Sequence, residues 1–184
     1  MSCRTLVGIA KDSCQSNKGG LYTTIWATNR SKLVISADTT GSGSDVAETG
    51  YVDLEWASGA SKTDMVTYSF RKQSSGLTSE GTFDDANGIS FFTNNLALVF
   101  ARQDVSKRMA IQALALQEDL AVIVKDANGE MYFLGFDDSV TTTAAGANTG
   151  TAASDANNYT ITLTDISNEL PYLVEQTTLD ALLA

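Results

Sequence analysis

The sequence predicts a mainly β protein: an antiparallel β-sandwich or barrel with one flanking α-helix and extended loops or arms. Short runs rich in β-branched and aromatic residues recur along the chain, as is typical of strands. Several runs alternate between apolar and polar residues, which indicates half-buried antiparallel strands. The chain has 184 residues, 43% of them hydrophobic, so we expect one domain spanning residues 1–184.

Five strands are predicted in the first half of the chain. In Tyr51–Trp56 the apolar residues Val52 and Leu54 share a side with Trp56. Val66, Tyr68 and Phe70 likewise share one side of the next run, so each strand presents an apolar face to a core. The predicted strands are Leu21–Ala27, Lys32–Ser36, Tyr51–Trp56, Val66–Phe70 and the weakly alternating Leu77–Phe83.

The flanking helix is predicted over residues 104–117. Ala, Leu, Met and Gln favour helices, and Asp104 is a suitable N-cap. The second half of this segment is apolar almost all round, which indicates burial on several sides. The alternative is a strand over Ile111–Leu116, where apolar residues also alternate. The apolar side of the predicted helix consists of Val105, Met109, Gln112 or Ala113, and Leu116.

A β-hairpin follows the predicted helix. Leu120–Lys125 is joined to Glu130–Phe136 by Asp126-Ala127-Asn128-Gly129, and Asn-Gly between two apolar runs is the strongest short-range hairpin signal. The same tetrapeptide occurs at residues 85–88, and residues 155–158 resemble it. Each copy precedes a strand-like run, so we interpret it as one turn chemistry used repeatedly.

The C-terminal part is predicted to contain the last two strands, Tyr159–Leu163 and Tyr172–Val174, separated by Pro171. Thr177–Ala184 is a short amphipathic stretch that is either helical or frayed.

Two loop-like stretches, residues 41–50 and 141–158, are candidate assembly arms. The first has the sequence GSGSDVAETG, and the second consists mostly of Thr, Ala, Gly, Ser and Asn. A structureless loop of the second length is uncommon inside a compact domain. We therefore expect that these stretches carry function or become ordered against another copy of the protein.

The residue types present exclude most catalytic mechanisms. The absence of histidine removes Ser-His, Cys-His and His-metal chemistry. Cys3 and Cys14 form no CxxC motif, and they are either a disulfide or two free thiols. The acids around 126–130 fit a turn better than a calcium site. The acid pairs at 84–85 and 137–138 arise easily among 22 acids, and nothing in the sequence indicates the cleft that a catalytic pair needs. We expect no enzyme activity, cofactor or metal.

The charge is strongly acidic and uneven. Lys and Arg total 12 against 22 Asp and Glu, a net charge of −10, which argues against a protein that binds nucleic acid by neutralising phosphates. Residues 126–184 contain nine acids and no base. They form either a solvated surface or a negative lumen that DNA passes without being held. The candidate lumen or assembly acids are Asp126, Glu130, Asp137, Asp138, Asp155 and Asp165.

Basic residues cluster in the pairs Arg71-Lys72 and Lys107-Arg108. They belong either to a solvated face or to a contact with the acidic C-terminal third of a neighbouring copy. No apolar run reaches the length that a bilayer-spanning helix needs, so we expect no membrane partner.

The order of four segments carries a family resemblance: residues 11–29 (KDSCQSNKGGLYTTIWATN), 68–104, 115–138 and 149–175. The opening Gly-Gly followed by Trp, the repeated Ala-Asn-Gly and the closing YTITL…PY resemble virion structural proteins of tailed bacteriophages that infect Bacteroidota-type hosts, crAss-like phages among them. More distantly, the pattern is similar to the phage tail-tube family. The resemblance covers about residues 1–175.

This resemblance implies an antiparallel sandwich or barrel whose copies form stacked rings, usually hexameric, around a channel for DNA. Its implied partners are further copies and other phage tail or connector proteins, in the tail of a virion assembled in the host cytoplasm. Tube, terminator, connector ring and other virion components remain open. The alternative is a monomeric carbohydrate-binding or adhesin-like module with an aromatic platform formed by Tyr22, Trp26, Tyr51 and Trp56.

Overall fold

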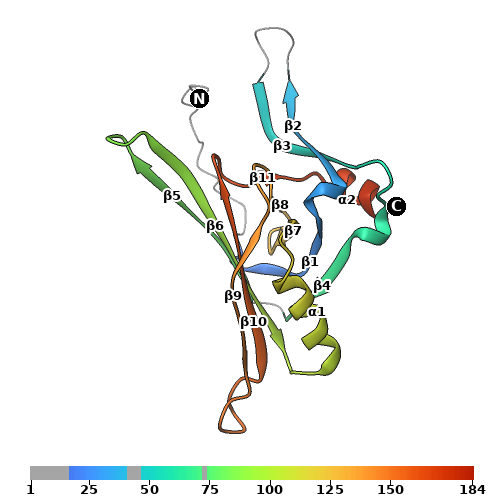
Figure 1. Cartoon of the computed structure of the whole chain (residues 1–184), viewed down its shortest axis with the longest axis vertical. Helices are drawn as coiled ribbons and strands as arrows, with labels where there is room; N and C mark the ends of the chain where they lie inside the picture. The colour runs from blue at the N-terminus through green and yellow to red at the C-terminus, as the bar shows by residue number, and fades with distance from the viewer. Residues whose placement is uncertain (1–16, 41–46, 72–73) are drawn as a thin grey trace.

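The computed structural model describes residues 17–40, 47–71 and 74–184, and it is mainly β, with 52% strand and 16% helix. Two sheets are present (Figure 1). The seven-stranded sheet has the order β2 (Leu33–Thr40), β3 (Ala47–Trp56), β11 (Tyr172–Leu173), β8 (Met131–Leu134), β7 (Leu120–Asp126), β1 (Leu21–Asn29) and β4 (Val66–Ser69). The four-stranded sheet has the order β5 (Gly76–Asp84), β6 (Ile89–Ala101), β10 (Asn158–Ser167) and β9 (Thr141–Asn148).

Within the described ranges the fold also contains helices α1 (Val105–Ala115) and α2 (Gln176–Leu183) and the 3₁₀ turns η1 (Arg30–Lys32) and η3 (Lys62–Asp64). The prediction of a mainly β sandwich with a flanking helix is confirmed. Each predicted strand overlaps an observed one, and residues 177–183 are helical. The alternative of a strand over residues 111–116 is wrong, because residues 105–115 form α1.

Residues 141–158 do not form one continuous loop, as their composition suggested, because the first half is a strand. Thr141–Asn148 form β9, which pairs with β10 through contacts such as Ala145 with Ile161. Thr favours strands, and the small side chains of Ala and Gly can lie at the edge of a sheet without being buried in a core. Only residues 149–157 form a loop. Of the first arm, residues 47–50 belong to β3, and 41–46 lie outside the described residues.

The Asp126–Gly129 turn forms as predicted. The Oδ1 atom of Asp126 accepts backbone N–H bonds from Asn128, Gly129 and Glu130 at 2.8, 2.7 and 2.9 Å. Gly129 has φ of 108°, a conformation that favours glycine. In the β5–β6 turn the equivalent acceptor is Asp84, which binds the N–H groups of Ala86 and Asn87.

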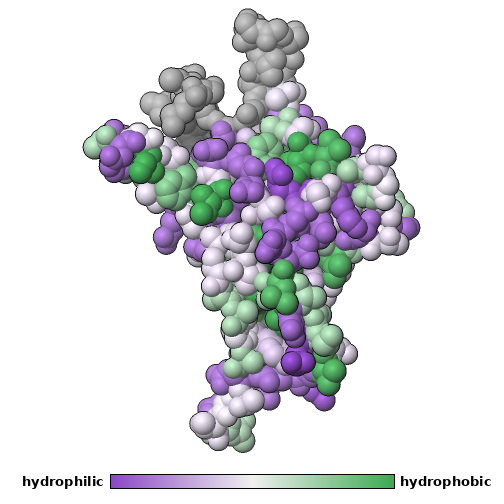
Figure 2. Space-filling view, in the orientation of Figure 1, coloured by the Kyte–Doolittle hydropathy of each residue, from purple (hydrophilic) through white to green (hydrophobic). Residues whose placement is uncertain are grey.

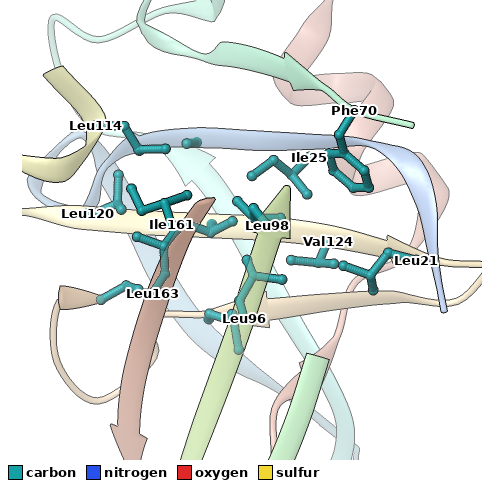
Figure 3. Packing of buried hydrophobic residues seen from close by; sticks show 14 of the residues in the cluster. Leu21, Ile25, Phe70, Leu96, Leu98, Leu114, Leu120, Val124, Ile161 and Leu163 are labelled. Carbon is teal, nitrogen blue, oxygen red and sulfur yellow. The ribbon is translucent and has the colours of Figure 1, made fainter. Parts of the chain in front are cut away.

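Strand β7, near the centre of the seven-stranded sheet, is buried on both faces. Val122 and Val124 of β7 pack into the first core, which lies between the two sheets (Figure 3). Ala121 and Ile123 point the other way, into a second core that includes Leu179 of α2. Burial on both faces explains why β7 is a continuous apolar run.

Helix α1 begins at the predicted N-cap, because the side chain of Asp104 accepts a hydrogen bond from the backbone N–H of Lys107 at 2.8 Å. The predicted apolar side is wrong, since the buried residues are Ile111 and Leu114. Only one narrow side of the helix contacts the first core. Ile111 and Leu114, three residues apart, lie on that side. Three residues of the predicted side are mostly exposed: Val105 (79%), Met109 (60%) and Leu116 (73%).

Candidate assembly surface

The four-stranded sheet has one face on the first core and an opposite face that we call the outer face. Leu96 and Leu98 of β6 and Ile161 and Leu163 of β10 are buried in the core, so their alternate neighbours lie on the outer face. Most of these neighbours are exposed or half-buried. The outer face contains Thr78, Glu80, Thr82, Asp84, Ile89, Phe91, Thr93, Asn95, Ala97, Val99, Ala101, Thr143, Gly146, Thr160, Thr162, Thr164 and Ile166.

Hydroxyl and amide groups connect all four strands across this face. The hydroxyls of Thr143 and Thr164 share a hydrogen bond of 2.9 Å. Thr164 donates to Oδ1 of Asn95 at 2.8 Å, and Thr78 donates to the carbonyl oxygen of Asn95 at 3.5 Å. The four strands contain no Lys or Arg, so the only charges on the outer face are the carboxylates of Glu80 and Asp84, among threonine, asparagine and several apolar side chains.

Both edges of this sheet lack a partner among the described residues, because β5 and β9 are its outermost strands. Natural proteins usually protect edge strands with Lys, Pro or bulges. Strand β9 contains neither Lys nor Pro, and its only protection is one register shift opposite Thr162 and Leu163. Its residues are small or polar, and all but Thr142 are exposed. Strand β9 therefore presents an accessible edge.

The six predicted lumen or assembly acids are not brought together on the outer face. Asp126 and Glu130 lie at the β7–β8 turn, and Asp137 and Asp138 lie between β8 and β9. Asp155 lies in the β9–β10 loop, where N–H groups of Ala152 and Thr151 hold the pKa of its carboxyl below the ordinary value.

Asp165 is the sixth acid, and it is 2% exposed on the core face of β10. Burial raises the pKa of its carboxyl, while a hydrogen bond from Asn94 acts in the opposite direction and the nearby charges of Asp137 and Asp138 raise the pKa further. A cavity of about 10 Å³, room for about one water molecule, lies beside it. Because its carboxyl does not reach the surface of the subunit, Asp165 does not belong to an exposed acidic surface.

Three of the four predicted basic residues, Arg71, Lys107 and Arg108, lie near the end of the sheet at which β6 meets α1. Arg71 is exposed after β4, and Arg108 is exposed on α1. Lys107 is half-buried, forms an ion pair with Asp104 at 3.1 Å and donates to the carbonyl oxygen of Ala101 at 2.9 Å. Lys72, like Cys3 and Cys14, lies outside the described residues.

The four aromatic residues considered as a platform have different environments. Trp26 and Trp56 pack against the second core, and the indole N–H of Trp56 donates to the carbonyl oxygen of Leu182 at 3.1 Å. Tyr51 is half-buried, whereas Tyr22 is 52% exposed. The two indole rings therefore contribute to the core.

The sequence analysis did not assign residues 89–101 to a strand. They form a thirteen-residue strand at the centre of the four-stranded sheet. A signal for this strand was present in the sequence, because large apolar residues alternate with their neighbours. Leu96, Leu98 and Phe100 form the core face of the strand, and Asn95, Ala97 and Val99 form its outer face.

Among residues 17–40, 47–71 and 74–184, no three His, Cys, Asp or Glu side chains are grouped so that they hold a metal ion. The same part of the chain contains no helix long and apolar enough to cross a membrane. Comparisons with family models, with curated proteins and with solved structures found no match for this chain.

Proposed function

We propose that this protein is a tail-tube subunit of a tailed bacteriophage, or a closely related head–tail or tail ring subunit. Its copies associate side by side into a ring, hexameric as the resemblance implies, around a channel through which DNA passes. One observation carries the proposal: the four-stranded sheet has two accessible edges and an outer face without a basic residue.

The direction of the strands supports a ring. Neighbouring strands in the order β5, β6, β10, β9 are antiparallel, so β5 and β9 also run in opposite directions. When copies are related by rotation, β9 of one copy meets β5 of the next in an antiparallel pair. The two edges have similar lengths, eight and nine residues. Closing the ring satisfies the backbone groups of both edges, which is how barrels remove edge strands.

The chemistry of the outer face suits a channel for DNA. The bulk of the subunit, including the seven-stranded sheet, lies against the core face. In a ring the outer face therefore points to the axis. Threonine and asparagine side chains cover much of it, and its only charges, Glu80 and Asp84, are negative. Such a lining repels phosphates and releases no counterions, so DNA is not held there.

The edge of β9 provides the experiment. We expect the wild-type chain to form rings in negative-stain images and to elute as an oligomer. Lysines introduced at two exposed positions of this edge, as A145K/A147K, should give monomers with an unchanged circular dichroism spectrum, because edge lysines block strand addition. The matched control is A153K in the exposed β9–β10 loop, which should still form rings.

Rings that persist in A145K/A147K would overturn the proposal, as would a wild-type chain that is monomeric at all concentrations. A persistent monomer that binds glycans would instead support the carbohydrate-binding alternative.

A further inference from the structure

The β5–β6 ribbon, residues 76–101, extends away from the body of the protein and ends in an exposed apolar tip (Figure 1). At this tip Phe83 is 65% exposed and Ile89 is 42% exposed. The ring of Phe83 packs edge-on against Phe92, with centroids 5.6 Å apart. A Cβ atom at Gly81 would lie 2.6 Å from the ring of Phe83, so the glycine leaves room for it. The ring is held by its own ribbon and remains uncovered.

The same ribbon is acidic. Its acids are Glu80, Asp84 and Asp85, and residues 76–101 contain no Lys or Arg. Asp84 accepts hydrogen bonds from Asn87 and Ala86, which hold the pKa of its carboxyl below the ordinary value. Figure 2 shows hydrophobic and hydrophilic side chains side by side on this projecting end, at the upper left.

Helix α1 presents a complementary surface, which we call the α1 patch: Val105, Met109 and Leu116, flanked by Arg102 and Arg108. At 3.6 residues per turn, its three apolar residues lie on the side of α1 opposite the buried strip. Arg102 has a positive φ of 64°, and its backbone N–H donates to the carbonyl oxygen of Asn157 at 2.7 Å. In the described ranges neither arginine lies within 4.0 Å of a carboxylate oxygen, although the charge of Arg102 helps to hold the pKa of the Asp104 carboxyl below its ordinary value.

The tip and the α1 patch of one copy cannot meet. They lie at the two ends of β6, whose thirteen residues span about 40 Å at about 3.3 Å per residue. Figure 1 shows the tip at the upper left and α1 at the lower right. An apolar, acidic projection at one end and an apolar, basic surface at the other therefore match only between two copies.

We infer that the tip of one copy docks on the α1 patch of a second copy, so that copies join head to tail. Phe83 covers the apolar residues of the patch, and Asp85 in the turn beside it faces Arg102 and Arg108. The tip and the patch are different surfaces at opposite ends of β6, so this contact repeats along the strand direction and generates a filament, whereas the β5–β9 contact between neighbours closes into a ring. The inference rests on the proposed function and deepens it, because this contact joins successive rings into a tube.

Charge exchange between the two surfaces tests the contact. Asp85→Lys and Arg108→Glu each place like charges opposite one another, so each variant alone should form rings but few tubes. We expect the protein concentration needed for tubes to rise about tenfold, or about 1.4 kcal/mol. An equimolar mixture should restore tubes, because the altered tip then meets the altered patch and the wild-type surfaces meet each other. Asp180→Lys on α2 is the control for altered net charge, and it should behave as wild type.

The outcomes separate this inference from the proposed function. Tubes formed by either charge variant at wild-type concentrations, or a mixture that fails to restore them, would overturn the inference. Wild-type rings that never stack would overturn it and leave the proposed function intact. Head-to-tail fibres without rings in the wild-type chain would support the inference and overturn the ring.

A cross-link provides a second measurement. Phe83→Cys and Met109→Cys are combined in a chain in which Cys3 and Cys14 are replaced by serine, and a short bismaleimide is added. Because the two sites lie at opposite ends of β6, a link forms only between copies and should give a ladder of multimers. The single variant Phe83→Cys should give at most dimers. The absence of a ladder in assembled protein would contradict the docking.

Discussion

The side-chain amide of Asn94 donates a hydrogen bond of 2.8 Å to Oδ2 of Asp165, and both side chains are buried between the two sheets. The remaining oxygen of each side chain, Oδ1, has no hydrogen-bond partner. Two unpartnered acceptors in a buried position favour a protonated carboxyl, which supplies a donor. This agrees with the raised pKa of Asp165, for which burial is the main cause.

We predict that the raised pKa of Asp165 makes the protein less stable as the pH rises. The folded state holds a proton that the unfolded chain releases near pH 3.9, so the free energy of unfolding falls between that pH and the folded-state pKa. Asp165→Asn stays neutral and should be more stable than wild type at pH 7 by about 1–3 kcal/mol. Urea unfolding from pH 4 to pH 8 measures the difference, with Asp180→Asn as the exposed control. A less stable Asp165→Asn at pH 7 would contradict this explanation.

We predict that Asp126 and Glu130 differ in their effect on stability, although both are acids of the same turn. Asp126→Ala removes the acceptor of three backbone N–H bonds and should lower the free energy of unfolding by about 1–2 kcal/mol. Glu130 is exposed, so Glu130→Ala should change it by less than about 0.5 kcal/mol. Chemical denaturation of both variants is the measurement, and equal effects would show that the turn does not depend on Asp126.

We predict that truncating Leu114, on the buried side of α1, destabilises the protein far more than truncating Leu116, on the exposed side. Leu114 is 3% exposed, so Leu114→Ala leaves a cavity in the first core and should cost about 2–5 kcal/mol. Leu116 is 73% exposed, and Leu116→Ala should cost less than about 0.5 kcal/mol in the monomer. Thermal and urea unfolding provide the comparison. A larger loss for Leu116→Ala would mean that the predicted apolar side of the helix is the one that packs.

Local chemistry made several elements predictable. Asn-Gly in the Asp126–Gly129 turn requires a backbone that few other residues adopt, so the β7–β8 hairpin could be placed closely. Asp104 accepts the N–H of Lys107 just before the helix, as its position indicated. Alternation in Tyr51–Trp56 identified the buried Val52 and Leu54. In each case the decisive atoms lie within a few residues of one another.

The candidate site was harder to predict because its parts come from distant segments. Thr141–Asn148 has no apolar pattern of its own, and it becomes a strand only by pairing with β10. Asp165 resembles the other C-terminal acids in sequence, yet the partner that buries it, Asn94, is 71 residues away. The sheet edge has no local signal, whereas alternation does place Asp165 on the same side of β10 as the buried Ile161 and Leu163.

The sequence alone determined the fold class, the turns, the helix N-terminus and which residues share a side of each element. The tertiary structure decided which side faces the core: Ile111 and Leu114 of α1 are buried, whereas Met109 is not. It also decided that β5 and β9 end the sheet. The physical reason is that a period of 2.0 or 3.6 residues groups side chains into faces, but only contacts between distant segments determine which face is removed from water.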